Sequence, residues 1–107
     1  MEVSSEPFSV HVERSGGVAR LRLSGRFDSV AVPELDWLID EMHSPDIVMD
    51  LGEVTFMNGA AWLAVMDVEH RAIDRGKRVR LVNTPEPIRR IFELTETEHL
   101  LSDPVGG

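Results

Sequence analysis

The sequence contains no cysteine, and this absence removes several functions at once. Without thiols, the chain has no disulfide, no cysteine nucleophile and no cysteine-ligated metal. The absence also fits the reducing cytoplasm, where we expect the protein to act. The histidines lie on separate predicted elements without ligand spacing, so we expect no metal site and no cofactor: they are His11, His43, His70 and His99.

Long apolar runs are missing as well. No stretch approaches the roughly 18 consecutive apolar residues that a membrane-spanning helix needs. The first ten residues, MEVSSEPFSV, have no basic region followed by an apolar segment, so they do not match a secretory signal. We therefore expect no insertion into a membrane.

Basic residues are few: 11 Lys and Arg stand against 19 Asp and Glu, which gives a net charge of −8. Binding to nucleic acid needs a basic face for the phosphates, so we do not expect a nucleic-acid partner. The acidity favours solubility, and it would also speed the capture of a partner with a basic surface.

Motifs that carry catalysis are also absent. The chain has no G-x-x-x-x-G-K-S/T or G-x-G-x-x-G loop that would cradle a phosphate. No Ser-His-Asp or Cys-His arrangement is suggested, and the neighbouring carboxylates Asp40 and Glu41 fall on the solvated face of a predicted helix. We predict that the protein is not an enzyme.

What the sequence does contain is the pattern of one α/β domain. At 107 residues with 42% hydrophobic content, the chain has room for a single core, which we place at residues 8–101, with 1–7 and 102–107 as flexible tails. Two alternating segments joined by a glycine turn predict a β-hairpin. Its inward residues are Phe8, Val10 and Val12 on the first strand and Ala19, Leu21 and Leu23 on the second.

The rest of the chain alternates between helical and strand patterns. A helix is predicted from about Ala31 to Met42, with Leu35, Leu38, Ile39 and Met42 at helical spacing and Ser44-Pro45 at its end. The later elements are a buried strand at 47–49, a connector at 51–57, a helix from Asn58 to Gly76, a strand at 79–82, and a last helix with Ile88, Ile91, Phe92 and Leu94 inward. Leu100 and Leu101 are expected to return to the body of the domain.

The order of elements is β-β-α-β-α-β-α. A hairpin followed by two strand-helix-strand units implies parallel pairing with right-handed crossovers. We predict an α/β fold with a mixed, mostly parallel sheet of about four strands covered by helices. The unit from Asp46 to Arg75 places a helix start at the carboxyl edge of that sheet, where open α/β domains hold their working surface.

Three local patterns, in this order and spacing, resemble the STAS domain (sulfate transporter and anti-sigma factor antagonist) of bacterial anti-sigma factor antagonists. They are Leu23–Asp28 (LSGRFD), Ile47–Met57 (IVMDLGEVTFM), and the helix that is followed by Gly76–Val82 (GKRVRLV) and a proline-containing turn. The resemblance covers Phe8 to Leu101, nearly the whole chain. It implies the STAS fold.

The resemblance also implies a function. In that family the loop is followed by Asp-Ser-Ser-Gly, and an anti-sigma factor that is also a serine kinase phosphorylates the second serine. The unphosphorylated form binds this partner and releases a sigma factor. The matching residues here are Asn58, Gly59, Ala60 and Ala61, so the acceptor position falls on Ala60, which has no hydroxyl.

The missing hydroxyl has a direct chemical consequence. A phosphate at a helix N-terminus is favoured by free N–H groups and the helix dipole, and it adds about −1.5 to −2 charge to a docking surface. Ala60 cannot carry it, so we predict a surface held in the unphosphorylated-like state. The nearest substitute acceptors are Thr55, expected to be buried or half-buried in the connector, and Ser29.

The candidate partner-binding residues surround this helix start: Asp28, Thr55, Met57, Asn58, Gly59, Ala60, Ala61, Trp62 and Met66. Several have structural alternatives. Asn58 is suited to cap the helix, and Asp28 to cap the preceding one. The small residues 59–61 suit close backbone packing as well as recognition. Trp62, with Met66 as its neighbour, is either an exposed interface anchor or packed under the first helix or the tail.

The leading hypothesis is an anti-sigma factor antagonist that binds a kinase-type anti-sigma factor or another signalling protein. Two alternatives stay open. One is a scaffold STAS module in a signalling assembly or as a transporter accessory, and the other is a sensor with an apolar pocket under the first helix.

Overall fold

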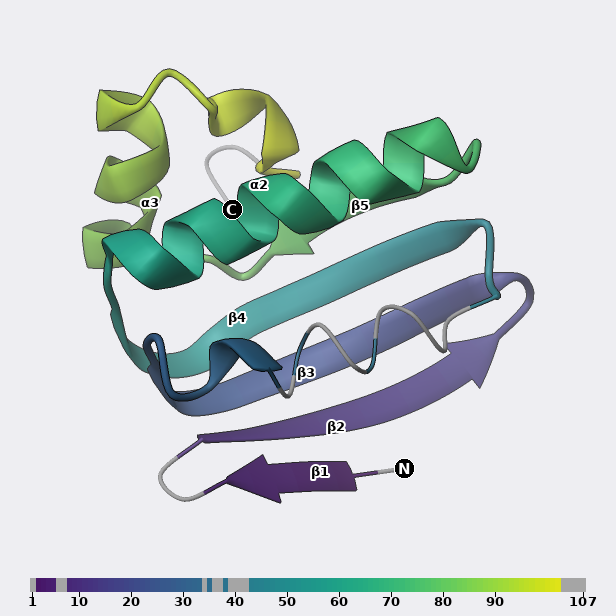
Figure 1. The fold of residues 1–107 in the computed structure, drawn as a ribbon, viewed down its shortest axis with the longest axis horizontal. Helices are drawn as coiled ribbons and strands as arrows, with labels where there is room; N and C mark the ends of the chain where they lie inside the picture. Colours follow the sequence, from purple (N-terminus) through teal and green to yellow (C-terminus); the bar gives the residue numbers. More distant parts are fainter. Residues whose placement is uncertain (1, 6–7, 34, 36–37, 39–42, 103–107) are drawn as a thin grey trace.

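The computed structural model describes residues 2–5, 8–33, 35, 38 and 43–102. Five strands form one sheet in the order β1-β2-β3-β4-β5 (Figure 1). The first two pairings are antiparallel and the last two are parallel, so the predicted α/β fold with a mixed sheet is confirmed. The elements are β1 (Glu2–Ser5), β2 (Phe8–Ser15), β3 (Val18–Phe27), β4 (Asp46–Met57), α2 (Gly59–Asp74), β5 (Arg78–Val82), α3 (Glu86–Leu94) and the 3₁₀ turn η1 (Glu98–Leu100).

The sheet has one strand more than the sequence predicted. Residues expected to be a flexible tail include Glu2–Ser5, which pairs antiparallel with β2 from Glu2↔His11 to Ser5↔Phe8. This pairing uses backbone groups at a sheet edge, so it needs no apolar alternation in the added strand. The polar composition of the segment therefore did not reveal it.

β4 has 12 residues, four times the length of the strand predicted at 47–49. Residues 51–57, which were predicted to be a connector, are part of this strand. The pairing of β3 with β4 contains register shifts between Arg22 and Ser24 and between Gly25 and Arg26. Across the shifts the buried residues of β4 come three apart, at Leu51, Val54 and Met57. This spacing hides the two-residue period of a strand, which is why the segment was interpreted as a connector.

Gly25 was expected to end the second strand, but β3 runs past it to Phe27. The residue has a φ of 89°, which suits glycine, and it lies at one of the register shifts. Gly25 therefore bends a continuing strand.

The helical predictions are largely confirmed. In α2 the buried stripe is the predicted one: Ala61, Ala64, Val65, Val68 and Ala72. In α3, Ile88 and Phe92 are buried, but the prediction for Leu94 is wrong: this last residue of the helix is 84% exposed. For the first helix, helical backbone is seen at residues 32, 33, 35 and 38, while Ile39 and Met42 lie outside the described residues. None of the helices in the described part of the chain is long and apolar enough to cross a membrane.

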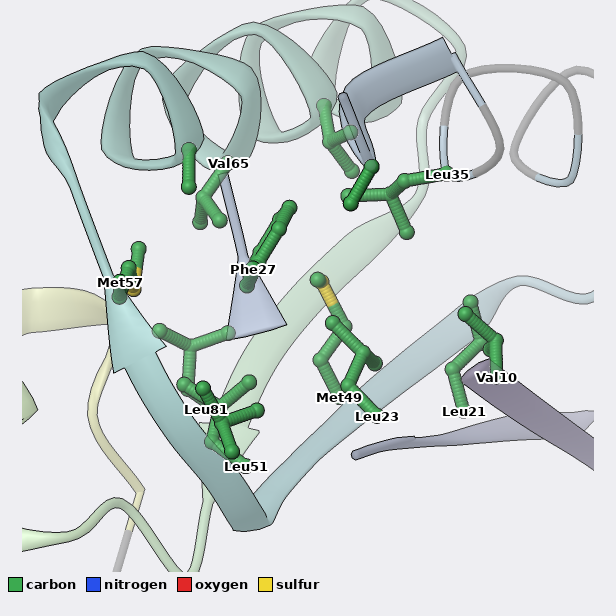
Figure 2. Packing of buried hydrophobic residues seen from close by; sticks show 14 of the residues in the cluster. Val10, Leu21, Leu23, Phe27, Leu35, Met49, Leu51, Met57, Val65 and Leu81 are labelled. Atoms are coloured by element: carbon green, nitrogen blue, oxygen red, sulfur yellow. The ribbon is translucent and has the colours of Figure 1, made fainter. Parts of the chain in front are cut away.

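The core lies between one face of the sheet and α2 with the first helix (Figure 2). β2 and β3 supply the inward residues predicted for the hairpin, and Leu35 and Leu38 are fully buried beside them. Phe8 and Phe27 stack with ring centroids 5.2 Å apart. Leu100 is buried, and Leu101 forms a parallel bridge to Leu81, so the end of the chain returns to the body as predicted.

Among the described residues, the buried charged side chain is that of Asp50. It links β4 by hydrogen bonds to β3 and to the residue after β5. Its carboxylate accepts hydrogen bonds from Arg20 Nη2 at 2.7 Å on β3 and from Asn83 Nδ2 at 3.1 Å after β5. It also accepts the Gly52 N–H at 2.9 Å. Burial alone would raise the pKa of Asp50, but these donors hold it below the ordinary value of 3.8.

We predict that Asp50→Asn lowers the free energy of unfolding by about 2–4 kcal/mol, because the amide leaves Arg20 and the Gly52 N–H without a charged acceptor. The pKa of Asp50 is lower in the folded protein than in the unfolded chain, where it is about 3.9. Ionised Asp50 therefore stabilises the folded state fully above the unfolded pKa, and this stabilisation is lost as the pH falls through the folded pKa. Urea unfolding as a function of pH measures both effects.

The exposed variant Asp74→Asn is the control, and it should change stability by less than about 0.5 kcal/mol. If Asp50→Asn matches this control at pH 7, or keeps its full deficit below pH 3, the proposed role of Asp50 is wrong.

Candidate functional site

The candidate site lies at the edge of the sheet where β3 and β4 end and α2 begins, at the left of Figure 1. Parallel pairing brings the two strand ends side by side, with Phe27 opposite Met57. Both of these side chains are buried in the core, so they hold the two strand ends against the body of the domain. The residues that face outward around them come from the turn after β3, the end of β4 and the first turn of α2.

α2 starts at a capped and uncharged terminus. The Asn58 side-chain oxygen accepts the Ala61 N–H at 3.0 Å, so the predicted N-cap is confirmed. The first turn contains no acidic residue. The N–H groups of Gly59 and Ala60 have no acceptor within the described part of the protein, as expected for the first donors of a helix.

The three small residues after Asn58 have different environments. Gly59 is exposed, and a Cβ placed on it would meet nothing within 4 Å. Ala60 is half-buried, whereas Ala61 is fully buried in the core. Close backbone packing therefore explains Ala61 but not Gly59, and the accessible part of the terminus is Gly59 with Ala60.

Beside this terminus Arg26 connects the ends of the two strands. Its guanidinium carbon lies 4.1 Å from the centre of the Phe56 ring, a cation–π distance, and its Nε donates to Asp28 Oδ2 at 2.8 Å. Asp28 Oδ1 also accepts the Val30 N–H at 3.0 Å, so Asp28 caps the turn that precedes the first helix. The hydrogen bond from Arg26 is the main cause that holds the pKa of Asp28 below 3.8.

Arg26 and Phe56 were not among the residues selected from the sequence. They lie opposite each other only because of the register shifts between β3 and β4. Phe56 is 38% exposed, and two further apolar side chains of this region are more exposed, Val30 at 69% and Leu63 at 61%. The expectation that Thr55 is buried or half-buried is wrong, because Thr55 is exposed on β4.

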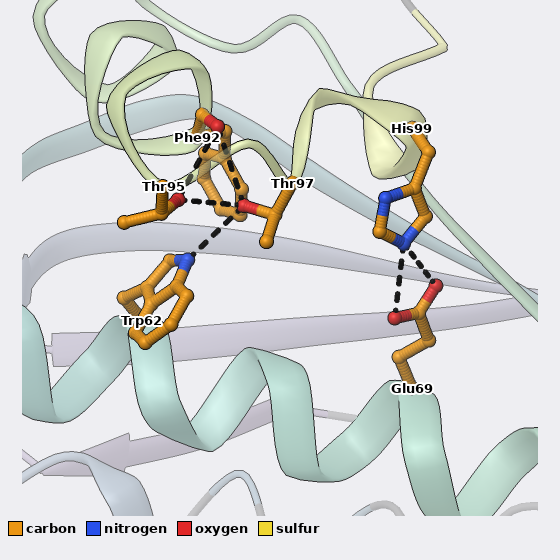
Figure 3. A network of polar contacts seen from close by, with 6 residues as sticks. All are labelled: Trp62, Glu69, Phe92, Thr95, Thr97 and His99. Atoms are coloured by element: carbon orange, nitrogen blue, oxygen red, sulfur yellow. Dashed lines mark hydrogen bonds and ion pairs between the residues drawn. The ribbon is translucent and has the colours of Figure 1, made fainter.

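Trp62 is packed and not an exposed anchor, but its hydrogen-bond partner lies neither in the first helix nor in the tail, where the packed alternative expected it. The indole is half-buried, and its Nε1–H donates to Thr97 Oγ1 at 3.2 Å in the turn between α3 and η1 (Figure 3). Thr97 in turn lies 2.8 Å from the Thr95 hydroxyl. Met66 is also half-buried against the core. Trp62 therefore joins α2 to the turn before η1, and Leu63 is the exposed apolar residue of this part of α2.

Among residues 2–5, 8–33, 35, 38 and 43–102, no group of three or more His, Asp or Glu is placed to hold a metal ion. A hollow of about 310 Å³ lies elsewhere, between the end of α2, β5 and η1. Its lining is largely charged, including Glu69 and His99, which pair at 2.9 Å (Figure 3).

We predict that Asn58→Ala lowers the free energy of unfolding by about 1 kcal/mol, because the Ala61 N–H loses its acceptor. Asn58→Asp keeps the cap and adds a negative charge at the helix N-terminus, so its stability should equal or exceed that of the wild type. Thermal unfolding of both variants at neutral pH tests the cap. Equal losses in the two variants would contradict it.

Comparisons with known proteins were made by sequence and by structure. The sequence profile of the family described as "Mlab, STAS domain" matches residues 10–102. A search of curated protein sequences found no match.

Several solved structures are similar. The anti-sigma factor antagonist SpoIIAA in its unphosphorylated form has a TM-score of 0.78 and 18% identity over 89% of this chain and 87% of that chain. An anti-sigma factor antagonist from Mycobacterium paratuberculosis has a TM-score of 0.78 and 23% identity over 94% and 89%. A sulfate transporter family protein from Wolinella succinogenes has a TM-score of 0.71 and 12% identity over 79% and 75%. At these identities the likeness shows a shared fold.

Proposed function

Since the chain belongs to the STAS domain family, we propose that it is a regulatory protein-binding module of the anti-sigma factor antagonist type. Its partner would be a serine-kinase-type anti-sigma factor, and binding this partner would free a sigma factor. The proposal assigns no catalytic residue and no cofactor, and it places the protein in the cytoplasm. The similarity of the fold to two anti-sigma factor antagonists supports it.

The observation that carries the proposal is the composition of the surface around the start of α2. We call it the docking surface, and it consists of Arg26, Asp28, Val30, Phe56, Gly59, Ala60 and Leu63. It contains the exposed apolar side chains of this edge, the two small residues at the start of α2, and the hydrogen-bonded pair Arg26 and Asp28. An apolar centre with a polar rim is the usual composition of a protein–protein interface.

Ala60 defines the regulation that we propose. It is the second residue of α2 and half-buried, and the resemblance to anti-sigma factor antagonists places it at the position of their phosphorylated serine. The free N–H groups of this turn would favour a phosphate, but Ala60 has no oxygen to carry one. We infer that the docking surface is always able to bind the partner. The extent of binding would then be controlled by the amount of partner or by the synthesis of this protein.

The docking surface predicts which exposed apolar residue of α2 matters for binding. Leu63 and Ile73 lie on the same helix and are equally exposed, at 61% and 62%, but only Leu63 is near the helix start. We expect Leu63→Asp to weaken binding to a kinase-type anti-sigma factor about tenfold or more, because a charge is buried at the interface. Ile73→Asp, the matched control, should change the dissociation constant less than about twofold.

Isothermal titration calorimetry with an anti-sigma factor encoded near this protein's gene is the measurement. Equal effects of the two substitutions would show that the docking surface is elsewhere. Recovery of transporter or scaffold subunits in a pull-down, with no kinase-type anti-sigma factor, would favour the scaffold alternative over the antagonist.

A second prediction concerns the missing acceptor. Incubated with the kinase-type partner and ATP, the wild-type protein should gain no phosphate, whereas Ala60→Ser combined with Asn58→Asp should gain about one per chain. Intact-mass spectrometry measures the 80 Da increment. A stoichiometric phosphate on the wild type, at Thr55, Ser29 or any other residue near the loop, would contradict the constitutive surface.

A further inference from the structure

The docking surface contains two charged side chains, Arg26 and Asp28, and they are not equally accessible. Arg26 Nε donates a hydrogen bond to Asp28 Oδ2 at 2.8 Å. The side chain of Arg26 is 52% exposed, whereas that of Asp28 is only 19% exposed. A protein that binds at this edge therefore meets mainly the guanidinium group of the pair.

The Asp28 carboxylate is occupied within the protein. Oδ2 accepts the hydrogen bond from Arg26, and Oδ1 accepts the Val30 N–H at 3.0 Å. These donors, Arg26 first, keep the pKa of Asp28 below 3.8, so the carboxylate is ionised at neutral pH. Each oxygen has a donor from the same chain, and Asp28 therefore serves to hold Arg26 and the turn after β3.

Arg26 is held from two sides, and its outer edge is free. The guanidinium carbon lies 4.1 Å from the centre of the Phe56 ring, so the ring covers one face of the planar group. Asp28 fixes Nε. In the part of the chain that the structure describes, neither Nη1 nor Nη2 has an acceptor. These two nitrogens form an edge of the guanidinium that binds a carboxylate through two parallel N–H groups.

Among the described residues, Asp28 is the carboxylate that pairs with Arg26. The first turn of α2 contains no acidic residue. Glu53 on β4, three residues before Phe56, is exposed and makes no ion pair with Arg26. The net charge of −8 acts at longer range and favours a partner whose surface is basic as a whole. At contact distance, Arg26 adds a local requirement of the opposite sign.

We propose that Arg26 selects the partner at the docking surface by binding a carboxylate of the anti-sigma factor through Nη1 and Nη2. This inference rests on the proposed function and names the chemistry of the partner at that surface. The matching segment of the partner places an Asp or Glu side chain next to an apolar one, because Arg26 is stacked on Phe56, an exposed apolar residue.

Burial makes this contact selective. Phe56 and Val30 are 38% and 69% exposed, and a partner that covers them also takes water from Arg26. A guanidinium edge that loses water without gaining an acceptor costs free energy of binding. A neutral or basic partner side chain at this position is therefore rejected, and a carboxylate is accepted. Because Phe56 and Asp28 already fix the arginine, little side-chain entropy is lost when the contact forms.

Two substitutions in the pair test whether Arg26 contacts a partner or only holds the turn. In isothermal titration calorimetry with the anti-sigma factor encoded near this protein's gene, Arg26→Gln should weaken binding about tenfold, because a carboxylate loses its charged donors. Asp28→Asn removes a negative charge beside that carboxylate and should strengthen binding about twofold. Arg14→Gln, the control at the far end of the hairpin, makes the same charge change as Arg26→Gln and should alter the affinity less than about twofold.

Both substitutions in the pair break the hydrogen bond between Arg26 and Asp28. Equal losses of affinity would therefore show that the pair is only structural, and would overturn the proposal.

A double-mutant cycle identifies the carboxylate. Each exposed Asp and Glu of the anti-sigma factor is changed to its amide and titrated with the wild type and with Arg26→Gln. We expect one amide to weaken binding of the wild type about tenfold and to have little further effect on Arg26→Gln. If Arg26→Gln does not fold, Arg26→Lys, which keeps the charge but lacks the paired donors, replaces it in the cycle. Additive effects at every position would contradict a direct contact.

Leu63→Asp in the same titration separates a failure of this role from a failure of the proposed function. Binding that Leu63→Asp weakens and Arg26→Gln does not would leave the docking surface in place and overturn the role of Arg26. Absence of any binding by the wild type would contradict the proposed function, and the role of Arg26 with it.

Discussion

The parallel pairing of β3 with β4 is the constraint on which the rest of the structure depends. It extends from Val18↔Asp46 to Phe27↔Met57, and it is the longest pairing between parallel strands of the sheet. At the end where β3 and β4 stop, it brings Arg26 next to Phe56, and α2 begins two residues after β4. On the outer face it brings Arg20 next to Asp50, which also holds the chain after β5. The proposed docking surface and the hydrogen bonds of Asp50 both depend on this pairing.

The start of α2 is capped and packed without a residue at position 60 that could carry a phosphate. A side-chain cap, a small-residue first turn and the surrounding apolar residues are all present without an acceptor hydroxyl at Ala60. Because the cap comes from Asn58 and the packing from Ala61, the geometry does not depend on residue 60. A side chain without a hydroxyl at residue 60 therefore leaves the cap and the packing of the helix start in place. In the proposed function, it removes the means of switching the surface off.

Much of the fold could be predicted from the sequence, because local rules determine it. The hairpin faces, the buried stripe of α2 and the Asn58 cap each follow from spacing within one element. The parts that failed depend on contacts between distant segments. The extent of β4 and the Arg26–Phe56 contact follow from register shifts, and β1 follows from backbone pairing at an edge. Trp62 packs against Thr97, 35 residues away, which no local pattern indicates.

In the proposed function, the protein binds its partner at the start of α2 and the ends of β3 and β4. Hydrogen–deuterium exchange of the free protein and of its complex with a kinase-type anti-sigma factor tests this claim most directly. We expect slower exchange on binding at residues 26–31 and 55–63, with little change at 86–100. Protection confined to α3 and η1, with no change at the start of α2, would contradict it.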